Sequence, residues 1–566
     1  MPFRFGDTNI RIIVLIWICF VLRGIFYSVL FPLWEGYDEF AHFAFVQHLV
    51  ATGTLPLAST PVSKEVEESL KLVPLPWTLR DMGVPHAIHD DYWMLSGDER
   101  RWREEQLSAL PRDWASQPAT AKHQYLSNWE AQQPPLYYWL VSFPLRIVWN
   151  ESLPVRVLVL RLLGVGMASL VIPLGFLIAL RVFRSREAAL GIAALIAAMP
   201  ELFVNVCRVG NEGLAILLYS LLIYAALSFA EGPGRMRTIW LFGACMGLGL
   251  LTKAYFLTAL PAFAVVLTCI LLFEPDRRGA ILLRGLAAIA AALMICGWWY
   301  WRNHTLTGSW SGVMPDVALH KMPLWELLRQ IPRVDWKNAF DSLILSHIWF
   351  GNWSFLQVRS WIYHFYKYLA LLASLGLVAI YLVPWLKRSG RLTFLRSRRS
   401  LLVPSLFYGF FWLGLLYHIL ITFVAQGISA SQGWYLYCLV AAEVIVVMAG
   451  LLALSPARFQ PWVMPAATIG FSLLDIYTVH FLLAPYYAGL IAHKADGALA
   501  TFHVGMLRGA DLWSYIGRLA ANEPYLNHAG FLMIWFFYLL ATSGLVAISL
   551  RAGWRHCRDI SAGPSL

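Results

Sequence analysis

Twelve long apolar runs restrict what this chain of 566 residues can fold into. A helix needs about 20 mostly apolar residues to cross the hydrocarbon core of a bilayer. The composition agrees, because 59% of the residues are hydrophobic and 14% are charged, against roughly 45–50% and 25% in soluble domains. The sequence therefore predicts an all-α polytopic membrane protein with about 12 transmembrane helices, within a range of about 11–13. The runs cover residues 12–32, 157–182, 187–206, 213–230, 238–252, 255–273, 280–300, 363–385, 401–424, 434–454, 462–483 and 529–550.

The positive charge of the chain gathers in the short connections between these runs. A net charge of +11 could indicate a nucleic-acid partner, but short basic clusters beside apolar runs follow the positive-inside rule instead. With the N-terminus inside, every even-numbered connection and the C-terminal tail are basic, so both termini are predicted to be cytoplasmic. These positions hold Arg181, Arg184, Arg186, Arg235, Arg237, Arg277, Arg278, Lys387, Arg388, Arg391, Arg396, Arg398, Arg399, Arg458, Arg551, Arg555 and Arg558.

Three long segments, 33–156, 301–362 and 484–528, then fall on the outer side; we call them the outer loops. Residues 1–566 are interpreted as a single membrane domain that includes these loops, because the sequence has no evident repeat and no low-complexity segment. None of the seven cysteines lies in an outer loop, so no disulfide framework is expected. The first apolar run is interpreted as a retained helix, not a cleaved signal peptide. The expected location is the cell's inner membrane.

The stretch from Phe31 to Gly53, FPLWEGYDEFAHFAFVQHLVATG, places two adjacent carboxylates at the edge of the membrane. A helix that begins near Tyr37 would carry Asp38 and Glu39 in its first turn, where the helix dipole favours negative charge. The segment is too short and too polar to span, which favours a juxtamembrane amphipathic helix. The carboxylates are then either a reactive centre or simply charges at a helix start.

A second stretch, NWEAQQPPLYYWL, runs from Asn128 to Leu140 and ends in a short apolar segment. Its paired prolines can start a helix but cannot lie inside one, so a re-entrant or juxtamembrane helix is expected. Glu130 and Gln133 would lie at its outer mouth. Tyr137 and Tyr138 would lie in the interfacial aromatic belt, where the alternative to a pocket is ordinary membrane anchoring.

Several cations lie at the outer ends of the apolar runs, among them Lys253, Arg302 and Arg208, with Arg156 and Arg161 at the start of the second run. Charges at membrane depth are costly and indicate functional sites. The competing interpretation is that long side chains at helix ends extend to the interface.

In these features the chain resembles the GT-C superfamily of integral-membrane glycosyltransferases. The similar branch contains the protein O-mannosyltransferases and the aminoarabinose transferase that modifies lipid A. The matching stretches are the Asp38–Glu39 pair followed by His42, the QPPLYYWL stretch, LLTK ending at Lys253, WRN…TG from Trp301, and SQGWYL from Ser431. In the last stretch, Trp434 stands where the family usually has an arginine.

The resemblance implies a sugar donor linked to polyprenyl phosphate, an acceptor on the outer face, and Asp38 as the catalytic base. The lipid phosphate is already a good leaving group, so cations are needed to neutralise it, a role for Lys253, Arg302 and Arg208. One base and no acid correspond to an inverting reaction. Glu39 would orient the acceptor or support Asp38, and the expected acceptor or pocket residues are His42, Glu130, Gln133, Tyr137 and Tyr138.

No cofactor is predicted with certainty, and metal use stays open. A divalent ion could lie between Asp38 and a second carboxylate, with Asp90, Asp91 and Glu130 as the candidates. The acceptor can be a lipid, a glycan or a protein. The alternatives are a multi-spanning transporter or flippase, a ligase or polymerase that uses a lipid-pyrophosphate donor, and a non-catalytic membrane scaffold. A transporter is less favoured because transporters commonly carry internal repeats.

Overall fold

The computed structural model describes residues 8–82, 86–110, 127–233, 236–383, 392–509, 512–521, 523 and 526–561. Four of the basic residues expected on the inner side, Arg235, Lys387, Arg388 and Arg391, lie outside this part. Within it, the chain is built of helices. Its single sheet among the described residues is a parallel pair of two-residue strands, β1 (Pro74–Leu75) and β2 (Ala87–Ile88).

Ten helical segments of the described chain are long and apolar enough to cross a membrane. Five are single helices: α1 (Thr8–Leu30), α11 (Glu212–Glu231), α18 (Ser360–Leu382), α20 (Arg398–Gln426) and α26 (His528–Ser561). The other five join shorter pieces: α7 (Leu153–Ser169) with α8 (Val171–Val182); η4 (Ala254–Thr258) with α13 (Ala259–Phe273); η5 (Pro275–Arg277) with α14 (Arg278–Thr307); η8 (Gly433–Leu439) with α21 (Val440–Leu454); and α22 (Gln460–Thr478) with η9 (Val479–Leu483) and α23 (Ala484–Tyr487).

The two remaining apolar runs also form helices, but neither is a simple span. The run at 187–206 is bent by 59° between α9 (Arg186–Ala198) and α10 (Pro200–Val206). The run at 238–252 forms the 15-residue helix α12 (Met236–Leu250). Each of the twelve predicted runs therefore corresponds to a helix, and the all-α polytopic fold class is confirmed. The span predicted over 187–206 is a pair of helices joined at a bend, because Pro200 has no amide hydrogen to donate to the preceding turn.

A buried ion pair compensates for this break. Arg23 of α1 donates to the backbone oxygens of Ala197 and Ala198, the last residues of α9. Its guanidinium also lies 2.8 Å from Asp475 of α22, and both side chains are fully buried. The carbonyl groups left open at the end of α9 thus find a donor inside the bundle.

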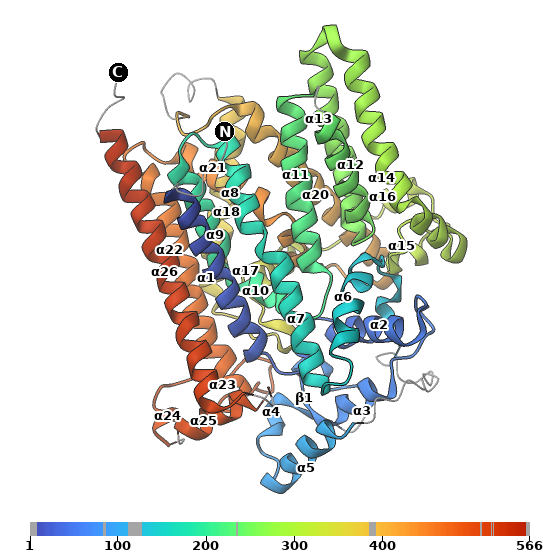
Figure 1. Cartoon of the computed structure of the whole chain (residues 1–566), viewed down its shortest axis with the longest axis vertical. Helices are drawn as coiled ribbons and strands as arrows, with labels where there is room; N and C mark the ends of the chain where they lie inside the picture. Colours follow the sequence, from blue (N-terminus) through green and yellow to red (C-terminus); the bar gives the residue numbers. More distant parts are fainter. Residues whose placement is uncertain are drawn as a thin grey trace.

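The helices run side by side along the long axis of the molecule (Figure 1). Glycines allow the closest of these approaches. A methyl group at Gly376 of α18 would lie 2.0 Å from the backbone oxygen of Gly450 in α21, so the two helices meet backbone to backbone, as small residues permit in membrane bundles.

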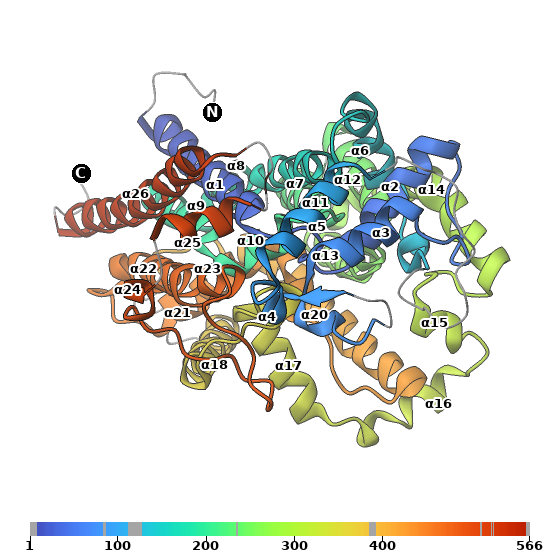
Figure 2. The ribbon, with the colours of Figure 1, turned by 90° about the horizontal axis from the view of Figure 1, so that it is seen from below.

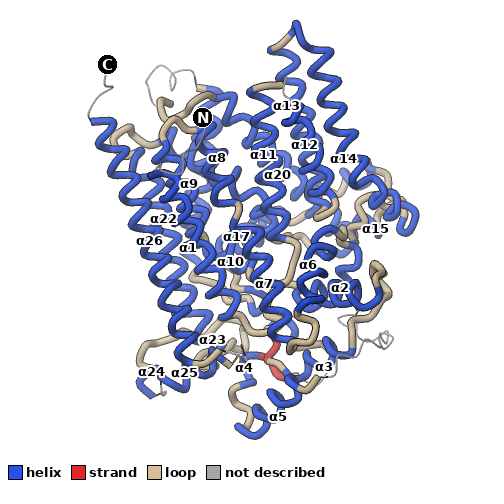
Figure 3. Tube along the Cα trace, in the orientation of Figure 1, coloured by secondary structure: helices blue, strands red, loops and turns tan. Residues whose placement is uncertain are grey.

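One end of the bundle carries a layer of short helices (Figures 1 and 3). It contains α3 (Lys64–Leu72), η1 (Trp77–Leu79), α4 (His89–Tyr92), α5 (Gly97–Ser108), α24 (Met506–Gly509) and α25 (Leu512–Ala520). The segment after α14 follows one side of the molecule when seen from below (Figure 2) and contains α15 (Met314–Ala318), α16 (Leu324–Leu328), η6 (Ile331–Arg333), α17 (Trp336–Ile348) and η7 (Asn352–Ser354). In Figure 1, α1 begins and α26 ends at the opposite end of the bundle.

The stretch after α1 forms α2 (Glu39–Thr52), which packs against α6 (Leu136–Ile147) and η3 (Trp129–Gln132). Every residue from Glu39 to Gln47 is buried. The expectation that α2 is an amphipathic helix on the membrane surface is therefore wrong. The helix is enclosed because α6 and η3 pack against it. These two elements come more than 75 residues later in the chain, so the local sequence does not reveal the contact.

Candidate functional site

The loop between α1 and α2 is held by Arg161 of α7. Its guanidinium donates to the backbone oxygens of Ser28 (3.1 Å), Phe31 (2.6 Å) and Pro32 (2.8 Å). The same group binds both carboxylate oxygens of Glu39, at 2.7 and 2.6 Å. All of these contacts are buried, and bidentate pairs of this kind are among the strongest polar contacts in proteins. Glu39 thus fixes the loop to the bundle.

Asp38 has a different environment from its neighbour. Its backbone is left-handed, with φ 55° and ψ 17°, which costs roughly 1–2 kcal/mol for a residue with a Cβ. Its side chain is partly buried, and Oδ1 accepts a hydrogen bond from Trp129 Nε1 at 3.1 Å. Burial raises the pKa of the Asp38 carboxyl, and the positive charge of Arg208 opposes this shift. A strained, partly accessible carboxylate is typical of a functional position.

Glu130 follows Trp129 and lies in the same cluster. Its Oε2 is 3.7 Å from His42 Nε2 and has no hydrogen-bond partner among the described residues. Burial raises the pKa of Glu130 to about 8, and the negative charge of Asp38 contributes to the shift. Burial also lowers the pKa of His42 to about 3, so this imidazole is neutral at physiological pH. Glu130 is therefore protonated near neutral pH, beside the Asp38 carboxyl.

The tyrosines of the QPPLYYWL stretch belong to the core of this site. Tyr137 and Tyr138 are fully buried, so the expectation that they lie in the interfacial belt is wrong. The hydroxyl of Tyr138 is 2.7 Å from His42 Nδ1, and that of Tyr137 accepts from the amide of Gly210 at 3.2 Å. Gln133 Oε1 accepts from the side-chain amide of Asn211 at 3.3 Å. The stretch closes over the loop that follows α10.

Two of the three predicted phosphate-binding cations meet at a single carboxylate. Arg208 Nη2 lies 2.7 Å and Lys253 Nζ 2.5 Å from Oε1 of Glu212, the first residue of α11. Arg208 also donates to the backbone oxygen of Tyr37, next to Asp38. Lys253 lies over the ring of Tyr255 at 4.9 Å. Both cations are at most 6% exposed, which places them inside the protein and not at its surface.

Arg302 is not part of this arrangement. It is partly exposed near the end of α14, and its guanidinium lies over the ring of Trp299 at 4.9 Å. Within the described part of the chain, no contact links it to Asp38, Arg208 or Lys253.

The structure adds residues that sequence reasoning did not select. Glu212 follows Arg208 by four residues, and this spacing at the start of a helix could have indicated the pair. Trp434 of the SQGWYL stretch stacks on Tyr37 with a ring separation of 3.9 Å. The position that departs from the family pattern thus packs directly beside the loop that carries Asp38.

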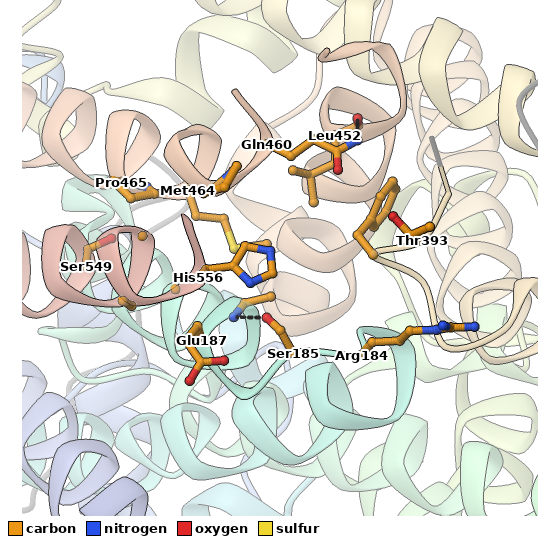
Figure 4. A pocket seen from close by; sticks show the side chains of 16 residues that line it. Arg184, Ser185, Glu187, Thr393, Leu452, Gln460, Met464, Pro465, Ser549 and His556 are labelled. Atoms are coloured by element: carbon orange, nitrogen blue, oxygen red, sulfur yellow. Dashed lines mark hydrogen bonds between the residues drawn. The ribbon is translucent and has the colours of Figure 1, made fainter. Parts of the chain in front are cut away.

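A cavity of about 10 Å³ lies beside Lys253 and Glu212, which is room for about one water molecule. It is lined by Asn205, Glu212, Ala215, Ile216, Lys253, Tyr255, Trp434, Tyr435 and Cys438. A larger cavity, of about 220 Å³, lies at the other end of the bundle, where α26 ends (Figure 4). There His556 and Met464 lie across from Ser185 and Glu187, and none of the predicted site residues lines that cavity.

The candidate metal ligands are only partly brought together. Asp90 is paired with His493, at 3.1 Å, and Asp91 is exposed. Among the described residues, no group of three or more His, Cys, Asp or Glu side chains could hold a metal ion. Glu130 is therefore the one candidate second carboxylate that lies in the Asp38 cluster.

Residues 132–301 match the family described as "Dolichyl-phosphate-mannose-protein mannosyltransferase". The match includes Gln133, Tyr137, Tyr138, Arg208 and Lys253, and it confirms the resemblance to that branch of the GT-C glycosyltransferases over this part of the chain. Asp38 lies before it and Arg302 directly after it. Among curated proteins, none matches the sequence.

Three solved structures are similar over most of the chain. ArnT from Cupriavidus metallidurans bound to undecaprenyl phosphate is 14% identical, with a TM-score of 0.43, 96% of this chain covered and 78% of that one. The apo state of ArnT is 13% identical, with a TM-score of 0.41 and coverage of 95% and 77%. The oligosaccharyltransferase AglB from Archaeoglobus fulgidus, in complex with an inhibitory peptide and a dolichol-phosphate, is 13% identical, with a TM-score of 0.32 and coverage of 95% and 56%.

Proposed function

We propose that this protein is a membrane glycosyltransferase that moves a sugar from a polyprenyl-phosphate donor to an acceptor on the outer face of the inner membrane. The observation that carries the proposal is the meeting of one strained carboxylate, Asp38, with two buried cations, Arg208 and Lys253, in a single connected cluster. The family match over residues 132–301 supports the same activity.

The reaction needs a base and a site for the leaving phosphate. The acceptor hydroxyl oxygen attacks the anomeric carbon and passes its proton to Asp38, while the bond from that carbon to the phosphate oxygen breaks. Polyprenyl phosphate leaves with the bonding electrons, and the configuration at the anomeric carbon is inverted. Lys253 and Arg208 neutralise the phosphate, so no acid is needed. Arg302 remains a further candidate for phosphate contact from the end of α14.

The other residues position the reactants. Glu39 and Arg161 hold the loop so that Asp38 keeps its left-handed conformation. The neutral His42 and the buried Tyr138 can accept and donate hydrogen bonds to an acceptor next to Asp38. Glu130, Gln133 and Tyr137 belong to the same cluster and are the further candidates for contact with the acceptor.

A transfer assay separates this function from the alternatives. Purified protein in liposomes is given labelled polyprenyl-phosphate sugars with lipid, glycan and peptide acceptors. The proposal expects cleavage of the donor and appearance of the label on an acceptor or in water. Movement of intact donor across the bilayer without cleavage would instead indicate a flippase. Cleavage of lipid-pyrophosphate glycans alone would indicate a ligase or polymerase.

A further inference from the structure

Glu212 occupies the position at which an anionic donor group would meet its cations. One of its oxygens, Oε1, accepts from both Arg208 and Lys253. The other, Oε2, is buried and has no hydrogen-bond partner among the described residues. A carboxylate held in this way presents one negative charge to two cations, as a phosphate oxygen would. A buried oxygen without a hydrogen-bond partner is unusual and needs an explanation. Movement of the Glu212 carboxylate during the reaction would explain why Oε2 has no fixed partner.

The space beside Glu212 is too small for a phosphate group. The adjoining cavity of about 10 Å³ has room for about one water molecule, and Trp434 and Tyr435 of η8 line it. With the Glu212 carboxylate in this position, Lys253 has less free space beside it than a phosphate group needs.

The backbone around Glu212 limits how it can move. A methyl group at Gly213 would lie 2.3 Å from the backbone oxygen of Gly164, so the start of α11 is packed tightly on α7. A methyl group at Gly210 would lie 2.5 Å from Glu212 Oε2. The absence of a side chain at Gly210 leaves room for the carboxylate while the helix start is fixed. Movement by rotation of the Glu212 side chain is the route that this packing leaves.

We propose that Glu212 is a placeholder anion: it holds Arg208 and Lys253 in the empty enzyme and exchanges places with the donor phosphate. This inference rests on the proposed function and adds a regulating residue to the same site. A glycosyl phosphodiester carries one negative charge, as does the carboxylate, so the charge that faces Arg208 and Lys253 is the same before and after the exchange. The released polyprenyl phosphate is a monoester with a charge of about −1.5 to −2. The return of Glu212 to its cations then competes with this product and helps to expel it.

The test is binding of undecaprenyl phosphate without any sugar, measured by tryptophan fluorescence on the purified full chain in detergent. Glu212→Gln removes the competing charge, so the Kd of this variant for undecaprenyl phosphate is expected to fall by about tenfold. Its kcat for sugar transfer should also fall, because release of the polyprenyl phosphate product becomes slow. Lys253→Ala should raise the Kd by at least about tenfold. Glu231→Gln is the matched control, since Glu231 ends the same helix and pairs with Arg181 at 3.3 Å; its Kd should equal that of the wild type.

The outcomes separate the two proposals. An unchanged or weaker affinity in Glu212→Gln, together with weakened binding in Lys253→Ala, overturns the placeholder role and leaves the phosphate site standing. Wild-type affinity in Lys253→Ala overturns the phosphate site itself. Glu212→Asp is the second variant, for use if Glu212→Gln does not fold. It keeps a negative charge at the start of α11, but its shorter side chain brings the carboxylate less close to Arg208 and Lys253. This variant should also bind more tightly than the wild type, and equal or weaker binding overturns the placeholder role.

Discussion

Asp38 and Glu39 are adjacent in the chain, but their carboxylates have different surroundings. The left-handed backbone at Asp38 separates the two side chains. Glu39 is fully buried against Arg161, whereas Asp38 stays partly accessible beside Trp129. The Glu39 carboxylate is therefore fully occupied by hydrogen-bond donors, whereas the Asp38 carboxylate keeps lone pairs that can accept a proton.

Glu39→Gln tests the anchoring role. Breaking a buried ion pair by removing one partner typically costs about 3–5 kcal/mol, so this variant should unfold at a clearly lower temperature than the wild type. Asp38→Asn, which removes no ion pair, should keep its Tm. The measurement is thermal unfolding of both variants in the same detergent, and equal Tm values would contradict the anchor.

The raised pKa of Glu130, beside Asp38, predicts a pH dependence. Glu130, whose pKa is raised to about 8 by burial and by Asp38, is protonated below that pH. Above about pH 8 it ionises and adds a second negative charge beside the donor phosphate, so kcat/KM should decline. Glu130→Gln should keep neutral activity and lose this alkaline decline. Glu151→Gln, an exposed carboxylate, is the control. An unchanged decline in Glu130→Gln would show that another group titrates.

At this scale the sequence was informative about which residues matter and less so about what each one does. The Asp38–Glu39 pair, His42, Glu130 and the two cations stand out by type and position, and the structure brings them together. The role of each residue depends on its partners. The spacing of Arg208 and Glu212 could have indicated one pair, but Arg161 and Glu39 are 122 positions apart and no local pattern links them. Arg302 was grouped with Lys253 because both follow apolar runs, but the length of α14 places it elsewhere.

At the scale of elements, η8 lies against the Asp38 loop and beside Lys253, and Gly433 sets its position. Gly433 donates from its amide to Ser346 Oγ at 2.7 Å, and a methyl group there would lie 1.9 Å from the backbone oxygen of Leu343. Trp434 follows directly and stacks on Tyr37. The packing of η8 on α17 therefore sets the position of Trp434, and Trp434 in turn contacts the loop that carries Asp38.

Gly433→Ala should displace η8 from α17 and move Trp434 away from Tyr37. Overpacking of this kind typically costs about 1–3 kcal/mol, and the transfer rate should fall with the Tm. Gly409→Ala in α20 is the control, because a methyl group there meets nothing within 4 Å. Equal transfer rates and Tm values in the two variants would contradict the role of η8.

Some elements could be predicted from the sequence and others could not. The length of the apolar runs alone predicted all twelve helices. In lipid, the backbone groups of each run must form hydrogen bonds with one another, and a helix allows this. The bend follows from Pro200, a local signal that apolar length does not register. The burial of α2 depends on contacts with α6, and these arise only when distant segments pack. SQGWYL was noticed as a weak motif, but its contact with Tyr37 joins residues almost 400 positions apart.

For the whole molecule, the layer formed by α3, α4, α5 and α25 marks the face that we assign to the outside. A cysteine at exposed Asp98 of α5 should react with a membrane-impermeant maleimide in intact cells. A cysteine at exposed Arg277 should react only after permeabilisation. Cys269 and Cys557, which are partly exposed, are replaced first to remove background. The reverse labelling pattern would contradict the orientation derived from the basic connections.

The most direct test of the account is the rate at which purified protein releases polyprenyl phosphate from a labelled polyprenyl-phosphate sugar, compared between the wild type and Asp38→Asn. The amide keeps the size of the side chain but cannot take the acceptor proton. We expect Asp38→Asn to bind undecaprenyl phosphate as the wild type does and to lose at least about 100-fold in rate, as removal of a general base typically does. A wild-type rate in Asp38→Asn would contradict the assignment of Asp38 as the base.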